Sequence, residues 1–467
     1  MCEVDGEAGH EPRPSRRDII RMGVGAAMMA AIPSPVRDRA LIRRGAAPDG
    51  RYLDAALRAA RWLRATAIAG EGGTTWPAVP PDAKTAGRTL YTGSPGVVLF
   101  LIELYRATRD RAWLDLAAAG ADHLAETVPD EATSPGAAGL YTGLAGVAFT
   151  LDEAARATGE ARYRSASRKA LGVIRAAARD AGAGAEWSET TDVISGNAGT
   201  GLYLLHAARG HGDDAVRELA RRVGLRLIER EHRTGDRSLW MMSPSFTRNM
   251  PNFSHGTAGV AYFLTTLGAE SGEATFIEAA SRGGRYLQSI ATPTTNDGRR
   301  IFHNDPDGRE LYYLSWCHGP AGTARLFHRL GAATRDARWT DYVSQLARGT
   351  IASGVPERSP GFWNNISQCC GNCGVSDFFV DLYRLRGDAS HLAFARRVAD
   401  DTLARATVED DGVKWVQAEN RVSPNDLLAQ TGLMQGAAGV GLAMLRLDGA
   451  LRGRKPAIVL PDSPFAV

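Results

Sequence analysis

A Gly-x-x-Gly element recurs seven times along the chain and constrains its fold more than any other feature. The copies begin at intervals of 50 to 65 residues, at Gly93, Gly143, Gly196, Gly256, Gly319, Gly371 and Gly436. Each opens a mainly apolar run, such as VVLFLIELY after the first copy. One such element is a weak signal in a chain with 52 glycines, but seven at a regular period indicate an internal repeat. The 467 residues therefore predict one continuous body rather than two or three separate domains.

A second helical segment lies between successive copies. Examples are RYLDAALRAARWLRA from Arg51 and DAVRELARRVGLRLIERE from Asp214, which place apolar residues on one face and charges on the other. The run after each glycine element is more uniformly apolar, which is typical of a buried helix. We predict that each unit is an outer amphipathic helix, a loop, the glycine turn and an inner helix. The sequence thus predicts an all-α fold, an α/α toroid of seven helical hairpins over residues 50–450, followed by a C-terminal tail at 451–467.

The two glycines of each element have separate predicted roles. The first is expected to adopt backbone angles closed to other residues where the chain enters the inner helix. The second, one turn further on, is expected to let neighbouring helices approach closely. The position before the second glycine holds a small residue, and in five copies that residue is alanine.

Composition and charge exclude several classes of protein. A hydrophobic content of 44% with 23% charged residues is ordinary for a globular chain and excludes a disordered or collagen-like one. The net charge of +3 is small for this length and no block of like charge occurs, so we expect no nucleic-acid partner. Five cysteines do not make a disulfide framework in a chain this long. The oligomeric state is left open.

Residues 1–40 have the pattern of a twin-arginine export signal. A polar start leads through Arg16 and Arg17 to two isoleucines and then to the small apolar stretch 23–32. That stretch is too short to span a bilayer, and no other segment is long and apolar enough to do so. The pattern predicts export to the periplasm or the cell exterior. The alternative is a disordered extension on a cytoplasmic protein, because paired arginines are common in an arginine-rich chain.

The residues that precede each first glycine should lie together at one end of the ring, at the N-termini of the inner helices. In chain order, these pairs are Tyr91-Thr92, Tyr141-Thr142, Ile194-Ser195, Ser254-His255, Cys317-His318, Cys369-Cys370 and Met434-Gln435. Three cysteines and two histidines fall in the fourth to sixth pairs. Because consecutive hairpins are neighbours in a ring, these side chains should converge, which is how a metal site would be assembled.

Cys317, Cys369 and Cys370 are therefore predicted to bind Zn²⁺. Three thiolates and one open position suit a four-coordinate catalytic zinc, and the positive ends of the inner helices favour thiolate over thiol. The alternative is that they are buried cysteines without a metal. Cys370 also forms a C-x-x-C with Cys373, a spacing found in redox pairs and zinc knuckles. Because Cys373 occupies the small-residue position, we assign it to core packing.

At these residues the chain resembles the lanthionine synthetase C-like family. Four motifs match in order: D-V-I-x-G at 192–196, S-H-G-x-x-G at 254–259, W-C-x-G at 316–319 and C-[CH]-G at 369–371. The similarity covers residues 50–450. The resemblance implies an α/α toroid and a zinc ion. It also implies a dehydrated peptide as substrate, in which a cysteine thiol is joined to dehydroalanine or dehydrobutyrine as a thioether, or in some branches a small thiol such as glutathione.

The implied chemistry can be assigned to residues. A thiol with a pKa of about 8.5 is mostly protonated at neutral pH, and zinc deprotonates it. Attack on the dehydroamino acid gives an enolate that needs a proton, which a histidine can deliver. We predict His255 as the catalytic proton donor, Asp192 as the group that orients it, and His318 as a second candidate donor. The alternatives are a helix cap for Asp192 and a hydrogen-bonded lining residue for His255, and we expect His303 to be an ordinary loop histidine.

Three positions depart from the family pattern. Cys370 stands where many members have histidine, which makes the site all-cysteine. In bacterial cyclases of the family, tyrosine is frequent at the place of His318 and arginine at the place of Tyr313. These departures leave the substrate open. Two other functions are kept as alternatives: a non-catalytic exported protein that binds zinc or thiols, and a glycoside hydrolase, which would need two carboxylates across the cavity.

Overall fold

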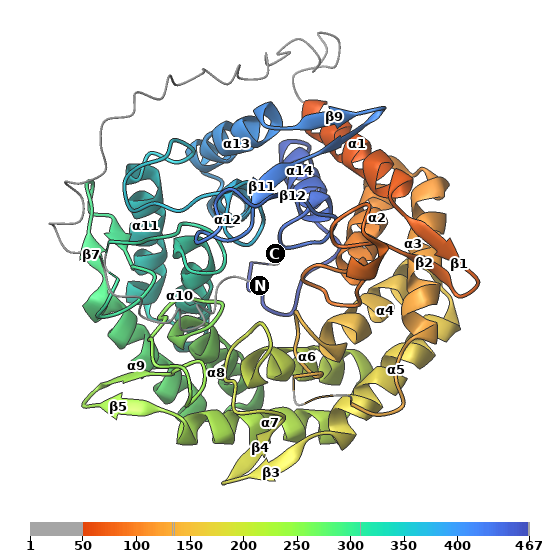
Figure 1. Ribbon diagram of the computed structural model, residues 1–467. Coiled ribbons are helices and arrows are strands. Elements are labelled where there is room, and N and C mark those ends of the chain that lie inside the picture. Colours follow the sequence, from red (N-terminus) through yellow and green to blue (C-terminus); the bar gives the residue numbers. More distant parts are fainter. Residues whose placement is uncertain (1–49, 133, 135, 309, 466–467) are drawn as a thin grey trace, which may run out of the picture.

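Two concentric rings of α-helices build the protein (Figure 1). The computed structural model describes residues 50–132, 134, 136–308 and 310–465. Fourteen α-helices occur within these ranges, alternating between the two rings, so the predicted all-α toroid is confirmed. The predicted export signal, residues 1–40, lies outside the described residues. None of the described helices is long and apolar enough to cross a membrane.

The two rings differ in how much of each helix is buried. Every residue of α8 from Thr257 to Gly268 is buried, because neighbouring helices surround it. An outer helix buries one face, which in α7 includes Val216, Ala220 and Leu227. The outer ring consists of α1 (Arg51–Ala65), α3 (Arg111–Glu126), α5 (Ala161–Ala176), α7 (Asp214–Glu229), α9 (Ala274–Ile290), α11 (Ala337–Ala352) and α13 (Ala389–Ala404). The inner ring consists of α2 (Ser94–Thr108), α4 (Leu144–Thr158), α6 (Asn197–His211), α8 (Thr257–Ser271), α10 (Pro320–Thr334), α12 (Asn372–Arg386) and α14 (Ala437–Leu451).

Each inner helix packs against the outer helix that follows it in the chain. Between α2 and α3 the connection is a tight turn of Arg109, in the left-handed conformation, and Asp110, whose side chain accepts a hydrogen bond from the N–H of Ala112. The hairpin is therefore inner then outer, the reverse of the division predicted from the sequence. The physical reason is that the loops carrying the glycine element are longer and cross the end of the ring. The first outer helix, α1, packs against the last inner helix, α14, and this contact closes the ring (Figure 1).

Short antiparallel β-ladders occupy several of the loops that lead from an outer to an inner helix. Helical periodicity did not predict them, since each strand has only two or three residues. The first ladder pairs Ile68 with Thr75. The pairs are β1 (Ile68–Gly70) with β2 (Gly73–Thr75), β3 (Arg179–Ala181) with β4 (Gly184–Glu186), β5 (His232–Thr234) with β6 (Arg237–Leu239), β7 (Thr292–Pro293) with β8 (Arg299–Arg300), β9 (Thr407–Glu409) with β10 (Gly412–Lys414), and β11 (Val416–Ala418) with β12 (Leu427–Ala429). A 3₁₀ turn, η2 (Ala83–Thr85), precedes α2.

The predicted role of the first glycine in each element is wrong, and the second glycine allows a close approach of loops rather than of neighbouring helices. Gly256 has φ −139° and ψ −156°, an extended conformation that any residue adopts. What excludes a side chain there is space, because a Cβ would lie 1.6 Å from the carbonyl oxygen of Met250. At Gly322, a second glycine, a Cβ would lie 1.8 Å from the oxygen of Trp316 and 2.7 Å from Cβ of Phe253 in the preceding repeat. Close approach is therefore the requirement at both positions.

A closed belt of seven backbone hydrogen bonds links the loops at the N-termini of the inner helices. Each loop donates an N–H to the next loop around the ring, and the last donates to the first. The N···O distances are 2.9 to 3.2 Å. The bonds run from Tyr91 to Tyr141, Tyr141 to Ile194, Val193 to Ser254, Ser254 to Cys317, Cys317 to Cys369, Cys369 to Met434 and Met434 to Tyr91. The belt therefore fixes the relative positions of the residues predicted to form the site.

The C-terminal segment turns into the ring rather than extending away from it (Figure 1). Asp462 is completely buried, and its Oδ2 accepts hydrogen bonds from Tyr141 Oη at 3.1 Å and from Trp316 Nε1 at 2.9 Å. Arg325 forms an ion pair with the same oxygen at 2.9 Å. The segment predicted as a tail therefore packs inside the toroid, as far as the structure describes it.

Candidate metal centre

The three predicted metal ligands converge at one end of the ring. The Sγ atoms of Cys317, Cys369 and Cys370 all lie within 4.8 Å of one another, and all three residues are buried. Cys317 lies in the loop before α10, and Cys369 and Cys370 lie in the loop before α12. The belt bond from Cys317 N to Cys369 O, at 3.1 Å, joins the two loops. The convergence predicted from the register of the repeats is confirmed.

The donors and their spacing fit a tetrahedral thiophilic metal. With Zn–S bonds of about 2.3 Å, the sulfurs of a tetrahedral zinc site are separated by about 3.8 Å. Cys317 Sγ and Cys370 Sγ are 3.4 Å apart, close to that value. The N-termini of α10 and α12 start two to three residues later, and their positive ends stabilise negative sulfur. Three soft ligands leave one tetrahedral position for another donor.

Two side chains that the sequence analysis gave no role contact these sulfurs. Tyr91 Oη donates a hydrogen bond to Cys369 Sγ at 3.2 Å. Gln435 Nε2 donates to Tyr91 Oη at 3.0 Å and lies 3.6 Å from Cys370 Sγ. Both occupy the repeat positions just before a first glycine, so register alone could have indicated them.

His255 and Asp192 form a buried pair beside the cysteines in the ring order. Nδ1 of His255 donates to Oδ2 of Asp192 at 2.5 Å. The other carboxylate oxygen accepts from the backbone N–H of Ser195 at 2.8 Å and of Gly196 at 2.7 Å. Asp192 therefore closes the turn before α6 and holds Nδ1 of His255, although it does not supply a side-chain cap to that helix. Nε2 of His255 is buried and has no hydrogen-bond partner among the described residues.

The rings of three histidines and a tyrosine lie close together in the site. The ring centroids of His255 and His318 are 5.6 Å apart, and those of His318 and His303 are 4.1 Å apart. Tyr313 meets His318 edge-on at 5.5 Å. His303 does lie in a loop, as expected, but it is buried against His318 rather than being an ordinary loop residue. Nothing in the local sequence around His303 distinguishes it, and its place beside His318 is a contact that only the folded structure shows.

Cys373 stays outside the cluster. Its side chain is completely buried in α12, and burial raises the pKa of its thiol well above the ordinary value, with the nearby Asp377 carboxylate adding to the effect. A neutral thiol in this setting packs as a small apolar group. The assignment of Cys373 to the core agrees with this environment.

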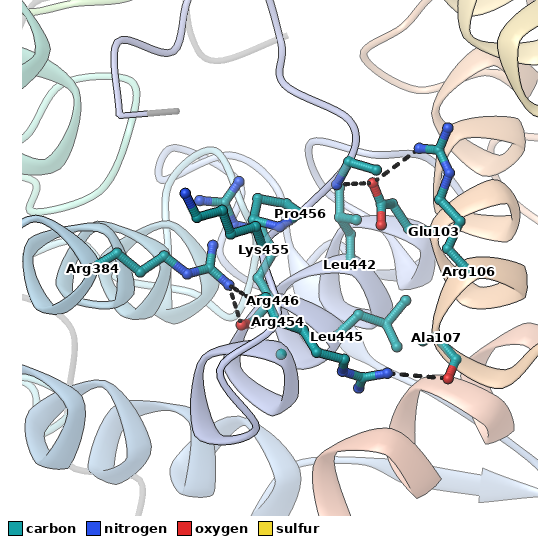
Figure 2. Close-up of a pocket in the computed structure, with 12 residues that line it drawn as sticks. Glu103, Arg106, Ala107, Arg384, Leu442, Leu445, Arg446, Arg454, Lys455 and Pro456 are labelled. Atoms are coloured by element: carbon teal, nitrogen blue, oxygen red, sulfur yellow. Dashed lines mark hydrogen bonds and ion pairs between the residues drawn. The ribbon is translucent and has the colours of Figure 1, made fainter. Parts of the chain in front are cut away.

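A pocket of about 80 Å³ lies near the opposite end of the ring (Figure 2). It is lined by the C-terminal parts of α2, α12 and α14 and by the chain that follows α14. Several of its cations are paired, as Arg446 is with Asp381 and Arg106 is with Glu103. The pocket contains none of the predicted site residues, and we assign it no part in the chemistry.

A helical toroid with three buried cysteines before two adjacent inner helices defines a narrow class of proteins. The chain belongs to the lanthionine synthetase C-like family, whose model matches residues 85–460. Among solved structures, nisin cyclase matches with a TM-score of 0.58 at 16% identity, covering 78% of this chain and 93% of the cyclase. That likeness shows a shared fold. Among curated proteins, no match is found.

Two other solved structures have more distant similarity. An α-1,6-mannanase from Salegentibacter sp. HEL1_6 has a TM-score of 0.45 at 12% identity, covering 86% of this chain and 99% of the mannanase. An unsaturated glucuronyl hydrolase from Bacillus sp. GL1 has a TM-score of 0.43 at 16% identity, covering 66% of this chain and 84% of the hydrolase.

Proposed function

We propose that this protein is a zinc enzyme that adds a thiol to dehydroalanine or dehydrobutyrine and so forms a thioether. The observation that carries the proposal is the cluster of Cys317, Cys369 and Cys370 in a member of the lanthionine synthetase C-like family. The oriented pair of His255 and Asp192 lies on the next hairpins around the ring. The proposed substrate is a dehydrated peptide, with a small thiol as an alternative nucleophile.

The three cysteines would hold zinc and leave its fourth position to the substrate sulfur. Zinc, when bound, supplies the positive charge that deprotonates a thiol at neutral pH. The surrounding chain contributes a closed, water-poor site, since all three cysteines are 1% exposed or less. Their loops are held by the backbone belt, which fixes the positions of the three sulfurs relative to one another.

His255 delivers the proton that completes the addition. The thiolate forms a C–S bond to the β-carbon, and the electron pair of the C=C bond moves to give an enolate. That enolate takes a proton at the α-carbon, and Nε2 of His255 is a buried nitrogen with no hydrogen-bond partner among the described residues. Asp192 accepts from Nδ1, which fixes the orientation of the ring. His318 is the second candidate donor because its ring lies next to that of His255.

The test combines metal content with turnover. Zinc per chain is measured in purified, reduced protein, and thiol consumption is then followed with dehydroalanine peptides by mass spectrometry. We expect one zinc per chain and a mass gain equal to the added thiol. His255→Ala should keep the zinc and lose turnover. Zinc-loaded wild-type protein that adds no thiol across a panel of dehydropeptides would refute the proposal.

The two alternative functions give different results in this assay. A non-catalytic zinc protein would bind thiols or peptides equally well with and without His255. A glycoside hydrolase would need a free carboxylate pair, but both oxygens of Asp192 are engaged by His255 and the backbone. Release of reducing sugar from a glycan panel would favour the hydrolase.

We also propose that residues 1–40 direct export through the twin-arginine route. The support is the arrangement of Arg16 and Arg17 before a short apolar stretch. Fusion of this segment to a reporter should send the reporter across the membrane, and Arg16→Lys with Arg17→Lys should abolish that transfer. Retention of both fusions in the cytoplasm would refute the proposal.

A further inference from the structure

An all-cysteine zinc site has a problem of selectivity that follows from its own chemistry. Three ligand thiolates and one substrate thiolate would surround the same ion, and every one of them is a nucleophile. The electrophile must combine with the substrate sulfur, because alkylation of a ligand would destroy the site. Something in the chain must therefore make the ligand sulfurs less reactive than the substrate sulfur.

The donor and the acceptor can be assigned in each hydrogen bond of Tyr91 and Gln435. The side-chain oxygen of Gln435 accepts from Asn365 Nδ2 at 3.4 Å, which places its NH₂ group on the other side. One N–H of that group goes to Tyr91 Oη at 3.0 Å. The hydroxyl proton of Tyr91 is then directed to Cys369 Sγ, 3.2 Å away, and the second N–H of Gln435 is directed to Cys370 Sγ, 3.6 Å away.

This network is buried and held from several sides. Tyr91 and Gln435 are 1% and 2% exposed, so water does not compete for their hydrogen bonds. The backbone oxygen of Gln435 accepts from Gln417 Nε2 at 2.7 Å. Tyr91 and Gln435 come from the first and last repeats, whereas the two sulfurs that they contact come from the sixth repeat.

We propose that Tyr91 and Gln435 are positioning residues that suppress the nucleophilicity of Cys369 and Cys370. A hydrogen bond to a thiolate engages a lone pair and stabilises the negative charge, so the sulfur attacks an electrophile more slowly. The substrate sulfur, which arrives from outside this network, then competes with two ligand sulfurs whose reactivity the network lowers. The inference rests on the proposed function, because it assumes zinc held by three cysteines.

The test measures the reactivity of each cysteine rather than turnover. Zinc-loaded protein is treated with iodoacetamide, in which a sulfur forms a bond to carbon and iodide leaves. The labelling rates of Cys317, Cys369 and Cys370 are then read separately by peptide mapping. We expect Tyr91→Phe to raise the rate at Cys369 about tenfold, the effect of about one charge-assisted hydrogen bond. Gln435→Leu should raise the rate at Cys370 in the same way.

Tyr141→Phe is the matched control. Tyr141 occupies the same repeat position as Tyr91, but its hydroxyl bonds to Asp462 instead of a cysteine. This control should leave all three labelling rates unchanged. A second readout is zinc affinity, measured by competition with a chelator, which should weaken in Tyr91→Phe and not in Tyr141→Phe.

Several results would overturn the inference. Equal labelling of wild type and both variants would show that the hydrogen bonds do not affect reactivity. A rise of equal size at all three cysteines would show only a loosened site. Wild-type protein without zinc would refute the proposed function itself. Zinc-loaded wild type whose variants label like wild type would refute this inference alone.

Discussion

Replacing Asp192 by asparagine tests the proposed proton donor while leaving the local fold in place. Asparagine keeps an oxygen that can accept from the backbone N–H groups of Ser195 and Gly196, the two bonds that form the turn into α6. Its NH₂ group would then face Nδ1 of His255, where the carboxylate now accepts at 2.5 Å. The imidazole would have to present a lone pair at Nδ1 instead of an N–H, so the hydrogen bond that now orients the ring would be reversed or lost.

The size of the effect follows from the burial of this pair. Asp192 is completely buried and His255 is 4% exposed, so solvent screens their interaction little. Proton transfer by a positioned side chain contributes about 10²- to 10⁴-fold to a rate, so loss of the bond that orients His255 should lower the rate of thiol addition about 100-fold.

The assay compares Asp192→Asn with wild type in zinc per chain, thermal unfolding and initial rate of thiol consumption. Zinc content and unfolding temperature should change little. Asp213→Asn is the matched control, because Asp213 caps α7 through the N–H groups of Ala215 and Val216 and lies outside the site. A wild-type rate in Asp192→Asn would refute the role of the pair. Loss of zinc in that variant would show that the aspartate acts on the metal site instead.

Three further predictions concern the metal, the glycine turns and pH. Cys317→Ala should lose zinc in metal analysis, whereas Cys373→Ala should keep it, because only the first belongs to the cluster. Gly256→Ala should lower the free energy of unfolding, measured in urea, by about 2 to 3 kcal/mol, since its Cβ would overlap the oxygen of Met250. Burial and nearby arginines lower the pKa of His206 to about 3. Below pH 6.5 the unfolded chain binds a proton there that the folded chain does not, so unfolding free energy should fall by about 2 kcal/mol between pH 7 and 5, and by less in His206→Gln.

The repeat predicted both the ring fold and the convergence of the three cysteines, and it did so for the same reason. In a closed array of equivalent units, equal positions in the sequence become equal positions around an axis. Cys317 and Cys369 precede their glycines by the same number of residues. They therefore occupy equivalent places in neighbouring loops, where a belt bond joins them. No side-chain contact had to be known in advance.

Side-chain contacts between repeats that are not neighbours were beyond such reasoning. Tyr91 of the first repeat contacts Cys369 of the sixth, past the seventh repeat, and the period of the repeat does not show how far a side chain reaches. Asp462 lies in no repeat, so only the folded chain shows that it joins Tyr141 and Trp316. His303 belongs to a loop without regular structure, whose course depends on packing rather than on any local pattern.

The closure of the ring makes the candidate site a product of the entire chain. Tyr91 and Gln435 are in direct contact although 344 residues separate them, so this contact forms only when both ends of the chain are present. During synthesis, Cys317 leaves the ribosome before the seventh repeat exists, and the last belt bond, from Met434 to Tyr91, cannot yet form. A truncated chain would thus present reactive thiols without the hydrogen bonds that surround them in the finished protein. Metal loading before closure would have to occur at a site open to solvent on the side where the first and last repeats later meet.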